Sequence, residues 1–487
     1  MSEEALAKPP LEPGEDAREV VVSLFLKQKK IYARAVTGRF AAWRWALVWA
    51  TQIVYYGLPW LRWNERPAVL FDLEARRFYI FELVLYPQDF IFLTGLLIIS
   101  AYALFLFTTV AGRLWCGFAC PQTVYTEIFM WIERQLEGDR MQRMRLDAGP
   151  WTLQRMLRKT GKHGLWLGLS LWTGFTFVGY FTPIRSLWQA ATTLGFGPWE
   201  GFWIGFFGLA TYGNAGFLRE QVCKYMCPYA RFQSVMFDKD TLIIAYDEGR
   251  GEPRGKHRTL GRKTDLKAAN LGHCIDCGLC VQVCPTGIDI RQGLQYECIG
   301  CAACVDVCDG VMDKMQYPRG LIRYDTQVAM AQPQLAQSRS RHLLRPRVLG
   351  YSAVLLLMCG GLVAGLLLRQ PFKVNVVRDR GALARVVDNG AVENVYRLQI
   401  MNTTEQPQRY RVSAAGLPQL SHDLRGEVTV GAAQATWVVL SVRLPPEAAA
   451  QAGPGSHPIH FELSQVPDSP TLPARQVVEK STFLVPR

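Results

Sequence analysis

The sequence is poor in histidine. It contains seven His residues, of which only His163 and His342 lie near a long apolar run, and each lies outside that run. A membrane haem held by two imidazoles needs facing histidines inside a helix bundle, so such a haem is not expected. The sequence also lacks a G-x-G-x-x-G stretch after a strand. An NAD or FAD site within this chain is therefore not expected either.

A cleavable signal peptide is also not expected. Residues 1–20 are acidic and contain Pro9, Pro10 and Pro13, whereas a secretory signal has a basic start followed by an apolar stretch. This composition predicts a disordered tail at the amino end.

Cysteine, by contrast, occurs in two regular runs with the spacing C-x2-C-x2-C-x3-C. They are Cys274, Cys277, Cys280 and Cys284, and then Cys298, Cys301, Cys304 and Cys308. Bacterial ferredoxins use this spacing for two 4Fe-4S clusters, and the fourth cysteine of each run binds the other run's cluster. The spacing thus predicts one cluster on Cys274, Cys277, Cys280 and Cys308, and a second on Cys298, Cys301, Cys304 and Cys284. The alternative is a pair of zinc sites or a disulfide framework, but zinc needs only four ligands per site and no such register. We therefore expect an electron-transfer protein.

Apolar residues are clustered into runs long enough to cross a bilayer, which takes about 20 residues as a helix. The chain is 49% hydrophobic and has 14 Trp. The five runs are roughly Trp45 to Leu61, Phe90 to Ala111, Gly164 to Ile184, Phe202 to Leu218 and Val348 to Leu368. Buried helices of a large soluble core are the alternative, but the last run carries no charge at all. An α-helical membrane protein with five transmembrane helices is expected.

The basic residues predict the orientation of these spans, because Lys and Arg concentrate in cytoplasmic connections. Nine lie between spans two and three, whereas only Arg185 lies between spans three and four. The amino terminus and the cluster region are therefore expected in the cytoplasm, and the carboxyl-terminal region outside. The residues from Val374 onward include 11 Lys and Arg and 10 Asp and Glu. Most of the net charge of +13 therefore lies in the part of the chain expected in the cytoplasm or membrane. Anionic lipid explains this excess without nucleic acid, which is not expected as a partner.

A second cysteine pattern occurs twice, 107 residues apart. Cys116, Cys120 and Pro121 follow span two, and Cys223, Cys227 and Pro228 follow span four, each as C-x3-C-P. If each pair lies on a helix, residues four apart share a face and present two sulfurs together. All four sulfurs could meet at the membrane surface if the two hairpins pack around a pseudo-twofold axis. Small apolar residues at a helix end are the alternative reading.

The chemistry of these four thiols has several interpretations. Thiolate and thioether ligands favour Cu(I), and Met226 lies between Cys223 and Cys227 as a candidate copper ligand. The pairs could instead cycle between dithiol and disulfide, or hold a structural metal.

The region after the fifth run changes in composition. Segments at Val395 to Met401, Arg409 to Ser413, Glu427 to Val430, Ala435 to Val442 and Ile459 to Leu463 largely alternate apolar with polar residues, and Gly or Pro lies between them. This pattern is typical of an antiparallel, immunoglobulin-like β-sandwich. The sandwich contains no Cys, so it is expected without disulfides. Its role is either a folded tail or a surface that docks another subunit.

The order of these features resembles a known family. Two C-x3-C-P hairpins, a two-cluster insert, a fifth span, the stretch Val376 to Arg380, and then Glu393 to Leu398 with Met401 and Asn402 closely resemble the cytochrome c oxidase accessory proteins called CcoG, FixG or RdxA. The resemblance covers nearly the whole chain from about Lys27. One departure is Asp309, which follows Cys308 where a typical ferredoxin run has Pro.

The resemblance implies a cupric reductase that helps assemble cbb3-type cytochrome c oxidase in a bacterial inner membrane. The implied catalytic thiols are Cys116, Cys120, Cys223 and Cys227, and the implied cofactors are two 4Fe-4S clusters with copper as substrate. Implied partners are copper ions, copper chaperones or transporters, oxidase subunits, an unidentified electron donor and the lipid bilayer, and a homo-oligomer is left open. The expected domains are a cytoplasmic tail (1–40), a four-helix membrane domain (41–235), a cytoplasmic ferredoxin-like domain (236–345), a fifth span (346–370) and a periplasmic immunoglobulin-like domain (371–487).

Two other functions compete with this one. A quinol-oxidising polyferredoxin subunit of a respiratory relay would resemble the chain through span four and the cluster insert, but would not be expected to carry the fifth span and the sandwich. A non-enzymatic assembly scaffold would carry its clusters for structure or redox sensing.

Overall fold

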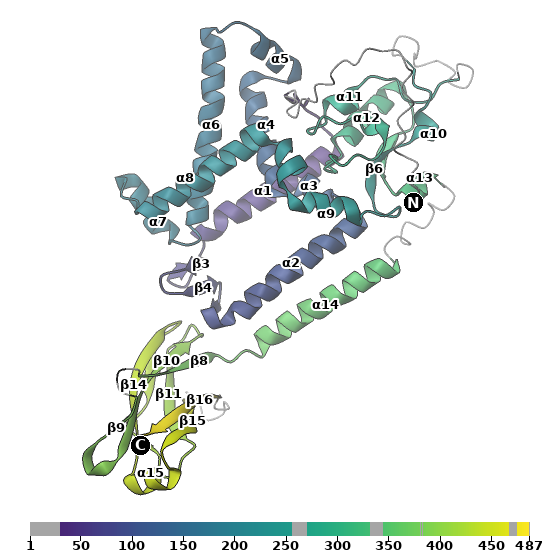
Figure 1. Ribbon diagram of the computed structural model, residues 1–487. Coiled ribbons are helices and arrows are strands. Elements are labelled where there is room, and N and C mark those ends of the chain that lie inside the picture. The colour runs from purple at the N-terminus through teal and green to yellow at the C-terminus, as the bar shows by residue number, and fades with distance from the viewer. Residues whose placement is uncertain are drawn as a thin grey trace, which may run out of the picture.

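The computed structural model describes residues 30–255, 270–331, 344–379, 381, 383–466 and 475–486. Figure 1 shows three parts in space: a group of helices, a small domain around α11 and α12 at one end, and a β-sandwich at the other. Two long helices, α2 (Phe90–Ala111) and α14 (Pro346–Leu367), run between these ends and contact each other.

Each of the five predicted apolar runs contains a helix. The other three helices are α1 (Arg39–Gly57), α6 (Leu153–Val178) and α8 (Pro198–Gly213), and a π-helical turn (Asn214–Leu218) continues α8. The predicted end of the third run is wrong, because α6 stops at Val178 and Ile184 begins a separate helix, α7 (Ile184–Thr193). Its start lies earlier than predicted, since the Thr152 hydroxyl caps the helix by accepting from the Arg155 amide.

Two helices in the described part of the chain are long and apolar enough to cross a membrane. They are residues 87–111, with a mean hydropathy of 2.5, and α14, with a mean hydropathy of 2.0. The amino-terminal half of α6 carries Arg155, Lys159 and Lys162, and α8 has only 16 residues. With these features, α6 and α8 are not among the helices long and apolar enough to cross a membrane. Five spans therefore remain a prediction.

Helices α2 and α14 approach each other closely because each offers a glycine. A Cβ on Gly95 would lie 3.3 Å from Leu362 Cδ1, and a Cβ on Gly365 would lie 3.2 Å from Phe92 Cε1. Small residues at such points let two helix backbones come close together.

The connection between α1 and α2 contains a three-stranded sheet that the apolar pattern did not predict. Its strands are β3 (Val69–Asp72), β4 (Arg77–Ile80) and β5 (Leu83–Leu85). Its buried Leu70, Tyr79 and Val84 pack with Met401 and Ala433 of the sandwich. This connection therefore lies at the same end of the molecule as the carboxyl-terminal domain.

The predicted sandwich is confirmed. One sheet has the order β12-β14-β10-β8, with β9 also on β10, and the other has the order β13-β11-β15-β16. The strands are β8 (Phe372–Arg378), β9 (Arg385–Val386), β10 (Val392–Asn402), β11 (Gln408–Ala415), β12 (Ser421–His422), β13 (Val428–Val430), β14 (Ala435–Leu444), β15 (Gly455–Val466) and β16 (Gln476–Val485). All five predicted segments overlap strands, while β8, β9, β12 and β16 were not among them. Fully buried Phe372, Tyr396, Phe461 and Phe483 fill the space between the sheets.

Candidate iron-sulfur and thiol site

The small domain at the other end is built around the eight regularly spaced cysteines. It contains α11 (Leu279–Gln282), α12 (Ala303–Met315) and a two-stranded sheet of β6 (Ile243–Tyr246) and β7 (Ile322–Asp325). Buried Ile244, Val305, Met312 and Ile322 form its core, and several of the cysteines pack against this core.

The cysteines gather in the two predicted groups of four. One cavity is lined by Cys274, Cys277, Cys280 and Cys308. A second is lined by Cys284, Cys298, Cys301 and Cys304, and Cys280 also borders it. The two cavities are therefore neighbours, and the fourth sulfur of each comes from the other run.

Each cysteine loop bends through left-handed backbone at equivalent places. Asp276 and Gly278 have φ of 50° and 64°, and Gly300 and Ala302 have φ of 68° and 58°. These residues lie immediately before and after the second cysteine of each run. Left-handed residues curl the chain tightly, so the first three sulfurs of each run face one cavity.

Asp309 has a clear structural role in place of the usual proline. It lies inside α12, which continues past Cys308 to Met315. Its carboxylate accepts a hydrogen bond of 2.9 Å from the Gly320 amide. A proline inside a helix removes a hydrogen bond and clashes with the preceding turn, so Asp309 allows this helix to extend beyond the last cysteine.

The donor set of both cavities fits 4Fe-4S clusters. Each cavity offers four soft sulfur atoms, as a cubane requires. Within the described ranges, no three His, Cys, Asp or Glu side chains converge tightly enough to hold a single metal ion. A cubane separates its ligands more widely than one ion does, so this spacing suits a cluster better than zinc. Burial raises the pKa of Cys298 and of Cys308 to about 12, so cluster binding must release thiol protons.

The four remaining predicted thiols occupy matching positions in two repeats. Cys116 lies in the short helix α3 (Leu114–Phe118), and Cys120 precedes α4 (Pro121–Glu137). Cys223 lies in a π-helical turn (Val222–Met226), and Cys227 precedes α9 (Pro228–Met236). The prediction that each pair shares one helix face is wrong. Pro121 and Pro228 disfavour helical backbone in the residue before them, so the second cysteine of each pair is extended.

These thiols nevertheless lie near one another across the repeats. Burial, together with the neighbouring Cys120 and Cys223, raises the pKa of Cys116 to about 12. Burial also raises the pKa of Cys120, with a contribution from Cys227. The two pairs are thus close enough to interact, although they do not form a compact ligand set for one ion within the described residues. Met226, the candidate thioether ligand, is 60% exposed.

The first thiol repeat packs directly on the second cluster loop. A Cβ on Gly117 would lie 2.6 Å from the Gly300 carbonyl oxygen and 2.8 Å from Cys301 Cα. Cys116 and Cys223 pack in one apolar group with Ile299 and Cys301. The structure therefore brings one cysteine of each thiol pair against residues that line the second cluster cavity.

Two buried arginines at this contact were not predicted. Arg113 donates to the Ala230 carbonyl at 2.6 Å and to the Cys298 carbonyl at 3.4 Å, which ties α9 to the cluster loop. Arg44 lies 3.9 Å from Glu127 and interacts with Cys301. Many basic residues lie next to the apolar runs, and nothing in the sequence distinguishes these two buried arginines from the exposed basic residues.

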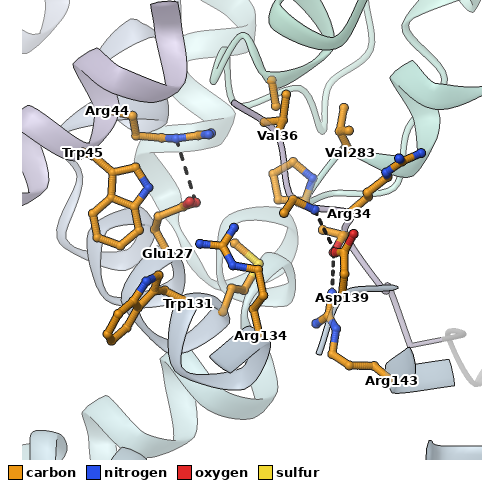
Figure 2. A pocket seen from close by; sticks show the side chains of 15 residues that line it. Arg34, Val36, Arg44, Trp45, Glu127, Trp131, Arg134, Asp139, Arg143 and Val283 are labelled. Carbon is orange, nitrogen blue, oxygen red and sulfur yellow. Dashed lines mark hydrogen bonds and ion pairs between the residues drawn. The ribbon is translucent and has the colours of Figure 1, made fainter. Parts of the chain in front are cut away.

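A cavity opens beside Arg44 on the other side of the second cluster. Its lining includes Val283 and Ala303, which are next to Cys284 and Cys304 in the chain. Figure 2 shows Arg44 pointing toward Glu127, with the indole of Trp45 beside them. This cavity lies between α1, α4 and the cluster domain.

Helix α1 is joined to the cluster domain at its amino end. The Asp306 carboxylate accepts from the Phe40 and Ala41 amides at 3.1 and 2.7 Å. A carboxylate at this position satisfies unpaired amides and complements the helix dipole.

Known proteins share these parts. A family described as a 4Fe-4S dicluster domain matches residues 218–327, and one described as a 4Fe-4S binding domain matches residues 93–137. The Ig-like fold at the C-terminus of FixG matches residues 362–486. The nitrogen fixation protein FixG of Rhizobium meliloti is 37% identical over 445 residues, covering 85% of this chain and 84% of FixG.

The chain belongs to the FixG/RdxA family. RdxB of Cereibacter sphaeroides is 40% identical, covering 83% of this chain and 86% of RdxB, and RdxA of the same organism is 37% identical, covering 85% and 89%. A crystal structure of a FixG-related protein from Vibrio parahaemolyticus aligns with 24% of this chain and 97% of its own, at 23% identity and a TM-score of 0.20. This FixG/RdxA member is therefore an iron-sulfur electron-transfer protein with two 4Fe-4S clusters and an Ig-like carboxyl-terminal domain.

Proposed function

We propose that this protein is a membrane-bound cupric reductase that supplies Cu(I) for assembly of cbb3-type cytochrome c oxidase. One observation carries the proposal: Cys116 and Cys223 pack with Ile299 and Cys301 at the wall of the second cluster cavity. Thiolates prefer soft Cu(I) over Cu(II). A copper ion held by these sulfurs would lie within a short distance of an electron carrier.

The proposed topology places five spans in a bacterial inner membrane. Helices α2 and α14 have the cluster domain at one end and the sandwich at the other (Figure 1). The count of basic residues assigns the cluster end to the cytoplasm. In this arrangement the sandwich is periplasmic and available to oxidase subunits or copper carriers.

Clusters bound in the two cysteine cavities would each carry one electron. Cys280 borders both cavities, which keeps the two carriers close together. Cys116 and Cys223 bind copper as thiolates and give up their protons as the metal–sulfur bonds form. Each Cu(II) then takes up one electron and becomes Cu(I), which the sulfurs retain until transfer.

The test follows copper and clusters in the same sample. The full chain is reduced anaerobically with dithionite, excess reductant is removed, and Cu(II) is added while cluster reoxidation and trapped Cu(I) are measured. Wild type should yield one Cu(I) for each electron removed, and the Cys116→Ser/Cys223→Ser variant should lose most of the rate. Cys359→Ser in α14 is the matched control. An unchanged rate of copper reduction in the double variant would show that Cys116 and Cys223 are not the copper site.

Iron content separates the thiol site from a third cluster. The 4Fe-4S binding family matches residues 93–137, which contain only Cys116 and Cys120, so a cubane there would also need Cys223 and Cys227. About eight irons per chain correspond to two cubanes. A content of about twelve would assign the four thiols to iron and overturn the copper site.

The scaffold alternative is tested in cells. Replacing Cys298 and Cys301 with Ser should remove the second cluster while leaving the transmembrane helices and the sandwich in place. Loss of oxidase assembly in cells with normal levels of this variant supports the reductase. Normal assembly would favour a non-enzymatic scaffold.

A further inference from the structure

A large cavity lies away from the cluster cavities, among α4, α6 and the π-helical turn that follows α8. Its volume is about 440 Å³, which is within the usual size of a small-molecule site. Its lining includes Ile31, Glu133, Lys162, His163, Trp166, Gly216, Phe217, Arg219 and Glu220.

One wall of this cavity is aromatic. The ring of His163 stacks on Phe217 with centroids 6.0 Å apart and packs edge-on against Trp166 at 5.3 Å. A Cβ on Gly216 would lie 3.2 Å from the Trp166 ring, so glycine keeps the wall open here. Phe217 is 60% exposed, and π-helical turns of this kind are frequent at functional sites. The wall suits a flat ring that enters from an apolar phase.

Two groups on the cavity wall are available to hydroxyl donors. Glu133 is fully buried, and its Oε2 accepts from Arg143 at 2.8 Å and from Arg219 at 3.0 Å. Its Oε1 forms an ion pair with Lys162 Nζ at 3.8 Å, beyond hydrogen-bond distance, and accepts no hydrogen bond from any described residue. His163 uses Nδ1 for a 2.9 Å contact with the Tyr212 hydroxyl, which leaves Nε2 for a ligand. A buried acceptor without a donor is costly, so Oε1 is a place for a ligand hydroxyl.

The lysines that line the cavity are paired with carboxylates, so they are not free for an anionic ligand such as a phosphate headgroup. Lys162 lies 2.9 Å from Glu137, and Lys30 lies 2.8 Å from Asp147. Lys159, which also lines the cavity, pairs with both Glu137 and Asp147. All three lysines are thus held by carboxylates, and an anion would also meet the buried carboxylate of Glu133. The wall therefore favours a neutral ring that carries two hydroxyl groups.

A second cavity leads from this one toward the clusters. Ile31, Arg219 and Glu220 line both cavities, and the second continues to Cys223 and Thr286. The Thr286 hydroxyl lies 3.3 Å from the Cys284 sulfur, a ligand of the second cluster. A molecule in the large cavity is thus linked to that cluster by a short row of packed residues.

We propose that the large cavity binds a membrane quinol and that this quinol is the electron donor of the protein, an inference that rests on the proposed reductase function. Glu133 Oε1 and His163 Nε2 accept hydrogen bonds from the two hydroxyls. On oxidation both O–H bonds break. One proton passes to His163 and one to Glu220 at the junction of the cavities, two electrons leave, one for each cluster, and a quinone departs.

The experiment uses the full chain with its clusters, kept anaerobic in detergent, and menadiol as the quinol. Menadiol should bleach the cluster absorbance of wild type. In His163→Phe, which keeps the ring stacking, the menadiol-driven rate should fall by about tenfold or more, and calorimetry should show weaker menadione binding. His163→Gln should keep more of the binding while still losing the rate. His460→Phe on β15, at the far end of the molecule, is the matched control and should behave as wild type.

Dithionite separates this proposal from the reductase function. All variants should reduce with dithionite and then reduce Cu(II) at the wild-type rate, which also verifies their folding and cluster content. If menadiol fails to bleach wild type, or bleaches His163→Phe and wild type equally fast, the quinol site is overturned while the reductase stands. If dithionite-reduced wild type leaves Cu(II) unreduced, the reductase fails, and the menadiol result still decides the quinol site.

Discussion

Gly117 of the first thiol repeat touches Gly300 of the second cluster loop, backbone to backbone. The space between them admits no side chain, since a Cβ on Gly117 would lie 2.6 Å from the Gly300 carbonyl oxygen. Gly300 itself has φ of 68°, which disfavours any residue with a side chain. The contact therefore sets how close the Cys116 repeat comes to the second cluster cavity.

We expect Gly117→Ala to disturb this contact. The added methyl group must push the Gly300 backbone away, and forced overpacking of this kind costs about 1–3 kcal/mol. The variant should keep its iron but show slower electron transfer to copper, measured by anaerobic cluster reoxidation. Gly205→Ala in α8 is the control, because its Cβ would meet nothing within 4 Å. Equal rates in the two variants would contradict the prediction.

Asp309→Pro is expected to destabilise the cluster domain despite restoring the usual ferredoxin residue. A proline inside α12 costs about 3 kcal/mol, and the bond to the Gly320 amide is lost as well. The measurement is loss of cluster absorbance during chemical unfolding, which should occur at lower denaturant concentration. Asp309→Asn retains an acceptor oxygen and should stay near wild type. A Pro variant as stable as the Asn variant would show that α12 tolerates a break there.

Asp306→Ala should loosen α1 from the cluster domain. The substitution leaves the Phe40 and Ala41 amides without their acceptor, and loss of such a cap costs about 0.5–2 kcal/mol. Hydrogen exchange at these two amides should become faster. Asp313→Ala, at an exposed position near the end of α12 where Asp313 pairs with Arg319, should leave their exchange unchanged. Slow exchange in the Asp306 variant would mean that another group holds the end of α1.

The link between α9 and α14 should weaken in acid. Partial burial tends to raise the pKa of Asp238, but hydrogen bonds from Arg345 and Thr241 outweigh it and lower the pKa below its usual value. A carboxyl with a depressed pKa in the folded state stabilises that state above its unfolded pKa of about 3.9 and loses this contribution as the pH falls through the folded pKa. The melting temperature should therefore fall more steeply for wild type than for Asp238→Asn between pH 6 and pH 3, roughly the window set by that pKa. Parallel curves would contradict the prediction.

The cysteine spacing predicted more of the site than any other pattern. The two groups of four sulfurs and their crossed membership follow from C-x2-C-x2-C-x3-C because the gaps leave the first three cysteines on one tight loop. The alternation at Val395 to Met401 similarly predicted a strand, since Tyr396, Leu398 and Ile400 on one face of β10 are buried while Arg397 between them is exposed. Local chemistry sufficed in both cases.

Contacts between distant segments could not be predicted in the same way. Nothing near Gly117 in the chain indicates that Gly300 lies against it, and Arg113 looks like any basic residue after an apolar run. The C-x3-C-P pattern does not place both cysteines on one helix face, because Pro121 keeps Cys120 out of the helical conformation. The quinol cavity depends on Glu133, His163 and Phe217 meeting from three elements, and no single segment carries that signal.

The crossed membership of the cysteine groups has a consequence for how the protein is made. A nascent chain that ends before residue 298 has three sulfurs for one cofactor and one for the other, so neither can be completed. Both become possible only when Cys308 has left the ribosome, and α14 and the sandwich are synthesised after it. The second group is complete with Cys304 and the first only four residues later, so metal loading can begin before the last apolar helix is inserted, and the two sites become available almost together.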